Sequence, residues 1–280
     1  MGLDFNSIKL LIWSTTAGID ISKCAMLGRL SFMGVSDADV ASLLAKAAPT
    51  QPGVTSTGYV EPLLKHLGAQ SIESFDASTY ESATHLWDMN TPVSPEFHDR
   101  YSLVLDGGTL EHVFNFPNAI LSAMRMVRRE GHLVICVPAD GMFGHGFYQF
   151  SAELLYSLFS PGNGYNVIKM FVFQDYARAP IYEVISPVAL QQRNKLCSNM
   201  PVLLYAIGKR IGDVPDKLEV MQSDYVNTWT ANFENLHHTH RRRIRIPFDT
   251  IYKRRYVKSL ATAFLNFPFW DRRSFVEWKP

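Results

Sequence analysis

The chain has 280 residues, of which 47% are apolar and 19% are charged, and its formal net charge is +1. These values exclude a disordered chain and allow one large α/β domain, or one domain with a sizeable appendage. The apolar run at residues 8–13 contains Lys9 and is too short for a signal sequence or a membrane span, so we expect a cytoplasmic protein with no transmembrane segment.

Residues 1–100 alternate between helical and strand patterns. Ser36 and Asp39 have the spacing of a helix cap, and Gly68 suits the end of the last helix in a helical insertion at residues 36–68. The predicted elements are a helix ending before Gly18, strands at residues 23–27, 71–77 and 84–87, helices from Ser36 to near Pro49 and at residues 59–67, and a helical turn at residues 80–83.

A strand, a helix and a second strand are predicted between residues 101 and 138. Residues 101–106 and 132–137 are apolar runs, and residues 112–129 carry apolar side chains at helical spacing with basic residues near the end. Two strands that bracket one amphipathic helix form a βαβ unit, so the strands should be parallel and buried on both faces. Ligands of such sheets bind beyond the carboxyl ends of the strands.

Fewer elements are predicted between residue 139 and residue 210, where the domain is expected to end. Ser151 should cap a helix that runs to about Phe159. Residues 165–174 and 202–207 are predicted strands, and because a long segment joins them they fit one edge of the sheet.

Acidic residues close three successive predicted strands: Asp76, Asp88 and Asp106. Each of them alone could simply terminate its strand, since polar residues often do. Three acids at the same edge would instead form an acidic rim that accepts hydrogen bonds from ribose hydroxyls and from an exocyclic amine.

The segments FDASTYESATHLWDMN, YSLVLDGGTLEHV and GHLVICVP resemble class I S-adenosylmethionine-dependent methyltransferases, and more narrowly their small-molecule branch. The resemblance covers about residues 23–175 and is strongest at residues 71–150. It implies a Rossmann-like doubly wound α/β sheet, mostly parallel with an antiparallel edge, and S-adenosylmethionine lying across the strand ends. It also implies methyl transfer, which we expect to reach a hydroxyl of a small molecule or glycan.

By position, the resemblance implies a cofactor site built from several strand ends. Its residues are Asp76 and Ala77 at the ribose, Asp88 and Met89 at the adenine, Asp106 and Gly107 at the methionine side, His112 just beyond, and Gly28 in the first turn. The family usually has a glycine-rich first turn, whereas this turn reads GRLSFMG, in which only Gly28 is suitably placed and Arg29 would crowd a second close approach. Either the cofactor is held differently, with part of residues 36–58 as a lid, or its affinity has been lost.

The segment GHGFYQF at residues 144–150 supplies the candidates for chemistry. Methylation of an oxygen requires removal of the hydroxyl proton, and flanking glycines leave His145 free to act as the base. Tyr148, with neighbouring aromatic residues, could form a platform for a sugar or a ring. The alternative is a simple connection whose histidine bonds a backbone carbonyl. His112 opens its helix, so capping or orienting the loop is the simpler role for it.

Residues 211–280 are predicted to be a basic C-terminal extension packed on the domain. From residue 237 to residue 280, eleven Lys and Arg face three Asp and Glu, with aromatic residues interleaved. This pattern can contact a polyanion or a membrane surface, or dock on the body with its charges solvated. The histidines at residues 237–240 have no Cys or acid at ligand spacing, so no metal site is predicted.

Two alternatives to small-molecule methylation stay open at this point. One is a non-catalytic relative that kept the sheet and serves as a binding or scaffold protein, which the glycine-poor turn favours. The other is a nucleic-acid methyltransferase that uses the basic extension. The sequence leaves the acceptor and the oligomeric state open.

Overall fold

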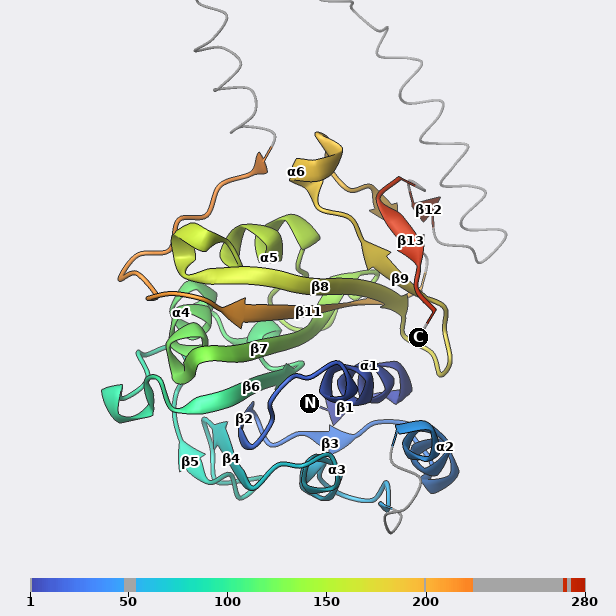
Figure 1. Ribbon diagram of the computed structural model, residues 1–280, viewed down its shortest axis with the longest axis vertical. Helices are drawn as coiled ribbons and strands as arrows, with labels where there is room; N and C mark the ends of the chain where they lie inside the picture. The colour runs from blue at the N-terminus through green and yellow to red at the C-terminus, as the bar shows by residue number, and fades with distance from the viewer. Residues whose placement is uncertain (1, 48–53, 199, 224–268, 271–272, 280) are drawn as a thin grey trace, which may run out of the picture.

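The computed structural model describes residues 2–47, 54–198, 200–223, 269–270 and 273–279 (Figure 1). The strands are β1 (Gly2–Leu3), β2 (Lys23–Leu27), β3 (Ser31–Phe32), β4 (Ser71–Asp76), β5 (His85–Leu86), β6 (Tyr101–Gly107), β7 (Val127–Asp140), β8 (Tyr165–Gln174), β9 (Ile181–Val184), β10 (Leu196–Cys197), β11 (Val202–Arg210), β12 (Phe269–Trp270) and β13 (Phe275–Glu277). The helices are α1 (Phe5–Thr16), α2 (Asp37–Ala47), α3 (Glu61–His66), α4 (Phe116–Met126), α5 (Ala152–Leu158) and α6 (Pro187–Leu190), with short 3-10 turns η1 (Pro95–Phe97), η2 (Leu110–His112) and η3 (Pro161–Asn163).

The large sheet has the strand order β13-β9-β8-β11-β7-β6-β2-β4-β5. From β7 to β5 all neighbours are parallel. Strand β11 runs antiparallel to both β7 and β8, so it is the reversed strand among the seven from β8 to β5. Strands β9 and β13 continue the sheet in antiparallel pairs beyond β8. The predicted fold class, a mostly parallel doubly wound sheet with an antiparallel edge, is confirmed.

Helices cover both faces of the sheet and create two apolar cores (Figure 1). On one face α4 and α5 pack against the sheet, and on the other α1, α2 and α3 do. All seven residues of β6 are buried, which explains why its sequence is a continuous apolar run and lacks alternation.

The predicted caps are confirmed, whereas several element limits are wrong. Ser36 and Asp39 exchange side-chain bonds with each other's backbone N–H at 3.2 Å, and Ser151 Oγ accepts from Leu154 N. The helix predicted at residues 112–129 spans only Phe116–Met126, because a proline lies in its first turn and Val127 is already extended. Residues 80–83 form a turn without a helix, and the strands at residues 165–174 and 202–210 lie inside the sheet, since β9 and β13 form the edge.

Most of the basic extension, including residues 237–268, lies outside the described residues. Its last described segment adds β13 to β9, and Trp278 packs edge-on against Trp13 of α1 and beside Phe171 of β8. Whether the remainder contacts a polyanion or a membrane stays a prediction. Among the described residues, no helix is long and apolar enough to cross a bilayer.

Acid should destabilise the protein partly through His132, a buried residue of β7 that is 8% exposed. Burial, with the nearby Lys209 charge, lowers the pKa of His132 to about 4. Between pH 6.5 and 4 the unfolded chain therefore binds a proton that the folded chain does not, so stability falls as the pH falls through this window. We expect His132→Leu to remove up to about 3 kcal/mol of this loss. Urea unfolding of both proteins at pH 7.5, 6 and 4.5 measures it; a gap between them that is independent of pH would contradict it.

Candidate functional site

The carboxyl ends of the parallel strands meet at one edge of the sheet. Leu27 at the end of β2 pairs with Phe75 on one side and with Asp106 on the other, and Asp76 pairs with Leu86. The chain runs outward from β2 to β5 and then returns to β6 on the other side of β2. A ligand of an open α/β sheet binds at such a reversal of strand order. We call residues 27–30, 76–89 and 106–112 together the carboxyl edge.

Two of the three predicted rim acids reach the surface of the carboxyl edge. Asp76 is half-buried and Asp88 is exposed, and each uses Oδ1 to cap its own turn, at Ser78 N and Asn90 N respectively. The hydrogen bond from Asn90 lowers the pKa of Asp88, so Asp88 is ionised. Ala77 is exposed beside Asp76, and Met89 is buried. This end of the edge offers acidic acceptors next to an apolar residue.

Asp106 differs from the predicted rim because it is fully buried. Its Oδ1 accepts from Thr109 N at 2.9 Å, and its Oδ2 has no hydrogen-bond partner among the described residues. Burial and the neighbouring Glu111 charge raise the pKa of Asp106 well above its usual range. Of the three predicted rim acids, one is therefore exposed, one is half-buried and one is enclosed.

Leucine side chains fill the space over Gly107, at the reversal point. A Cβ placed on Gly107 would lie 3.0 Å from Leu30 Cδ1 and 3.1 Å from Leu3 Cδ2, and both leucines are fully buried. Leu3 belongs to β1, which pairs in parallel with β3, and Leu30 is the residue directly before β3. Gly28 adopts a positive φ of 72°, as its turn requires. Close approach of a ligand to the β6 backbone requires these leucines to move.

Arg29 points away from the space that the leucines fill. Its Nε donates to Glu61 at 2.7 Å, and its guanidinium lies 3.9 Å from the centre of the Tyr59 ring. The residue that crowds the first turn is thus Leu30, two positions after Gly28.

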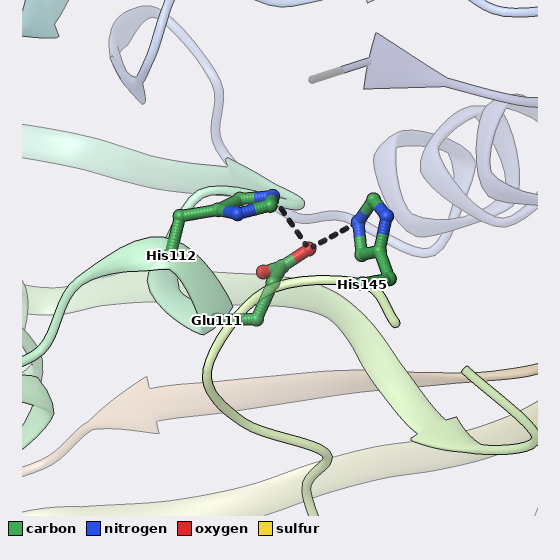
Figure 2. Close-up of side chains that lie close together, drawn as sticks. All are labelled: Glu111, His112 and His145. Carbon is green, nitrogen blue, oxygen red and sulfur yellow. Dashed lines mark ion pairs between the residues drawn. The ribbon is translucent and has the colours of Figure 1, made fainter. Parts of the chain in front are cut away.

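Glu111, His112 and His145 lie together beside the ends of β6 and β7 (Figure 2). Glu111 Oε1 is 3.4 Å from His145 Nε2 and 3.9 Å from His112 Nε2, and the two imidazole rings are 4.9 Å apart. The Glu111 side chain is 1% exposed, while those of the histidines are 44% and 53% exposed. The structure brings both histidine candidates together around a carboxylate that sequence reasoning left out of the site.

Burial sets the protonation of this cluster. It raises the pKa of Glu111, against the attraction of His145. It lowers the pKa of His112, and a positive charge on His145 lowers it further. The sequence marks Glu111 as a site residue only by its position between a glycine pair and His112. Its contact with His145 could not be predicted, because His145 is more than thirty positions away in the chain.

Backbone bonds fasten the loop that carries His145 to the turn that carries Glu111. Phe147 N donates to Glu111 O at 2.7 Å, and Tyr148 N to the same oxygen at 3.3 Å. The Tyr148 hydroxyl donates to Phe114 O at 2.6 Å. Because the hydroxyl proton is used in this hydrogen bond, Tyr148 helps to hold the loop in place. A catalytic role for Tyr148 stays a prediction. Phe114 and Phe147 are exposed here and meet edge to face at 6.2 Å, and Phe143 of the same loop is also exposed.

A pocket of about 270 Å³ opens at the end of β7. Asp140, the first residues of α5 and Leu196 line it together with Phe275 of β13. It is separate from the carboxyl edge, whose residues do not line it.

Comparisons with known proteins return solved structures alone: no family model matches the sequence, and no curated protein matches it. The N-methyltransferase NodS from Bradyrhizobium japonicum is 11% identical with a TM-score of 0.38, over 74% of this chain and 96% of that one. The 1,6-didemethyltoxoflavin-N1-methyltransferase from Burkholderia thailandensis, solved with bound 1,6-didemethyltoxoflavin and S-adenosylhomocysteine, is 9% identical with a TM-score of 0.38, over 74% of this chain and 78% of that one. The YcgJ protein from Bacillus subtilis is 11% identical with a TM-score of 0.40, over 74% and 99%.

At these identities and TM-scores the comparisons decide nothing about activity. The strand order carries the fold assignment: five parallel strands from β5 to β7, then a reversed strand inserted before β8. This is the sheet that the sequence resemblance implied. The chain therefore has a Rossmann-like, mostly parallel α/β sheet with one reversed strand, extended by two antiparallel strands.

Proposed function

We propose that the protein is an S-adenosylmethionine-dependent methyltransferase that methylates a hydroxyl of a small molecule or glycan. The observation that carries the proposal is the reversal of strand order between β2 and β6, beside which lie the ionised, exposed Asp88 and the half-buried Asp76. Fold alone does not fix chemistry, so the residues at the edge must support it.

The residues at the carboxyl edge fit the nucleoside half of the cofactor. Asp76 and Asp88 offer acceptors for ribose hydroxyls and an exocyclic amine, and the buried Met89 adjoins Asp88 in the chain. The methionine half fits only after Leu3 and Leu30 leave the space over Gly107. When bound, the cofactor supplies an electrophilic methyl group on a sulfonium.

The chain itself must position the acceptor and handle its proton. His145 is exposed at the end of β7 and is held near the buried Glu111, which supports its predicted role as a base. Exposed Phe114 and Phe147 give the acceptor a ring surface beside it, which supports a sugar or an aromatic compound.

Calorimetry with S-adenosylhomocysteine tests the proposal, and Asp88 supplies the sharpest variant. We expect Asp88→Ala to weaken binding about tenfold, through loss of one charge-assisted hydrogen bond. Asp216→Ala, which removes a fully exposed acid from another surface, is the control and should bind like the wild type. Equal affinity of the two variants would reject the adenine role of Asp88, and no heat from the wild-type protein at millimolar ligand would reject the enzyme.

A second candidate is a non-catalytic protein with the methyltransferase fold. The leucines over Gly107 favour it, because they occupy space that the methionine half of the cofactor needs. In that case S-adenosylhomocysteine would fail to bind both the wild-type chain and a chain in which Leu30 is shortened. The nucleic-acid alternative depends on residues 237–280 and stays a sequence prediction.

A further inference from the structure

We propose that Glu111, His112 and His145 bind a divalent transition-metal cation, such as Zn²⁺ or Mn²⁺. Two imidazole nitrogens and one carboxylate oxygen are the ligand set of many zinc and other transition-metal sites with open positions. The sequence predicts no metal here, because the three residues become a cluster only through the pairing of β6 with β7.

The distances between the three polar atoms match ligands of one ion better than they match hydrogen bonds. A charge-assisted N–H···O bond is usually about 2.7–2.9 Å long. The Glu111–His145 and Glu111–His112 pairs are longer, at 3.4 and 3.9 Å, and all three ligand atoms lie within 4.8 Å of one another. Two ligands at zinc bond lengths of about 2.0–2.1 Å in tetrahedral geometry lie roughly 3.3 Å apart. Side-chain rotations that bring the three atoms closer together would place an ion between them.

The burial of Glu111 supplies a second, independent observation. Its side chain is 1% exposed, and its Oε2 has no hydrogen-bond partner among the described residues. Within the described part of the chain, its ion-pair partners are His112 and His145, with no Lys or Arg. A buried carboxylate without compensation is costly, and a cation at Oε1 would supply the compensation.

The protein holds the two ligand-bearing segments at a fixed separation. Glu111 O accepts from both Phe147 N and Tyr148 N, two and three residues after His145. Gly146 makes this approach possible, because a Cβ at its φ of 71° would lie 2.8 Å from Glu111 O. The histidines remain half-exposed, so solvent or an acceptor can reach the open positions of the ion.

The role of the cation in catalysis rests on the proposed function. An acceptor hydroxyl bound to the cation would lose its proton to solvent water more readily. Its oxygen lone pair would then form the O–CH₃ bond while the C–S bond breaks and its electron pair stays on sulfur as a neutral thioether. His145 cannot be both a ligand through Nε2 and a base through the same nitrogen, so metal binding replaces its role as a base.

Metal titration of the full chain, without cofactor, tests the site. The histidines at residues 237–240 could bind metal adventitiously, so His237, His238 and His240 are first replaced by alanine. Zn²⁺ and Mn²⁺ are then titrated by calorimetry into this background and into its Glu111→Gln, His112→Ala and His145→Ala derivatives. His98→Ala, which lies outside the cluster, is the matched control. Thermal unfolding without metal verifies that each variant is folded.

We expect one equivalent of cation to bind to the background protein and to His98→Ala. Each of the three derivatives should bind at least about 100-fold more weakly, which exceeds the loss typical when a residue that only contacts a metal ligand is replaced. Absence of binding at 1 mM cation, or retention of binding in any one of the three derivatives, overturns the proposal. Because the titration contains no cofactor, its failure leaves the methyl-transfer proposal intact. Failure of S-adenosylhomocysteine to bind would likewise leave the metal site standing.

Discussion

Shortening Leu30 to alanine should strengthen binding of S-adenosylhomocysteine by at least about tenfold while it weakens the fold. The leucine side chain lies 3.0 Å from the position of a Cβ on Gly107 and is fully buried. If a ligand must displace it, the observed affinity is reduced by the cost of that displacement, and each 1.4 kcal/mol of cost is a factor of ten. The same truncation leaves a cavity, so the free energy of unfolding should fall by about 2–5 kcal/mol.

Leu44→Ala is the matched control for this experiment. Leu44 is buried in α2 and belongs to the same apolar core as Leu30, but its helix is not part of the carboxyl edge. We expect it to destabilise the chain by a similar amount without a gain in affinity. Calorimetry and urea unfolding on both variants measure the two effects. Equal ligand affinity in Leu30→Ala, Leu44→Ala and the wild type would show that Leu30 does not obstruct the edge.

Replacing Gly146 by alanine is expected to reduce turnover by about 100-fold, because displacement of a catalytic group by about 1 Å has that effect. The new Cβ would lie 2.8 Å from Glu111 O, the oxygen that fastens the loop, at a positive φ that favours glycine. The loop must shift, and His145 moves with it. The strain should also lower the free energy of unfolding by about 1–3 kcal/mol.

Gly144→Ala provides the comparison, since it flanks His145 from the other side. A Cβ on Gly144 meets nothing within 4 Å, and this glycine has no positive φ. Its turnover and stability should stay near wild-type values. If the two glycine variants behave alike in a methyl-transfer assay, or in metal titration when the acceptor is unknown, the attachment of the loop to Glu111 has no role in function.

Local patterns were sufficient to predict most strands of the sheet, but they missed β9 and β13 and did not predict the site. The apolar runs of β2, β6 and β8 and the caps at Ser36 and Ser151 are signals that each lie within a few residues, and the structure has them where they were predicted. The predicted C-terminal limit of α4 was wrong because the basic residues that were assigned to its last turns belong to β7, where Arg128 pairs with Asp20.

The predicted site depended on contacts that no local pattern carries. Asp106 ends its strand as expected, but the turn back to Thr109 and the approach of Glu111 enclose it. The covering of Gly107 requires Leu3, which reaches the edge only because β1 pairs with β3. Glu111 and His145 meet through the parallel pairing of β6 with β7. Each of these features joins segments that are distant in sequence.

The pairing of β13 with β9 makes the end of the chain part of the sheet, so a cut after residue 210 would not release a self-sufficient domain. A shortened protein would expose the unpaired backbone N–H and C=O groups of β9, and such an edge strand favours pairing with a strand of another molecule. It would also uncover Trp13 and Phe171, which Trp278 now shields. Expression vectors for this protein should therefore retain its final residues.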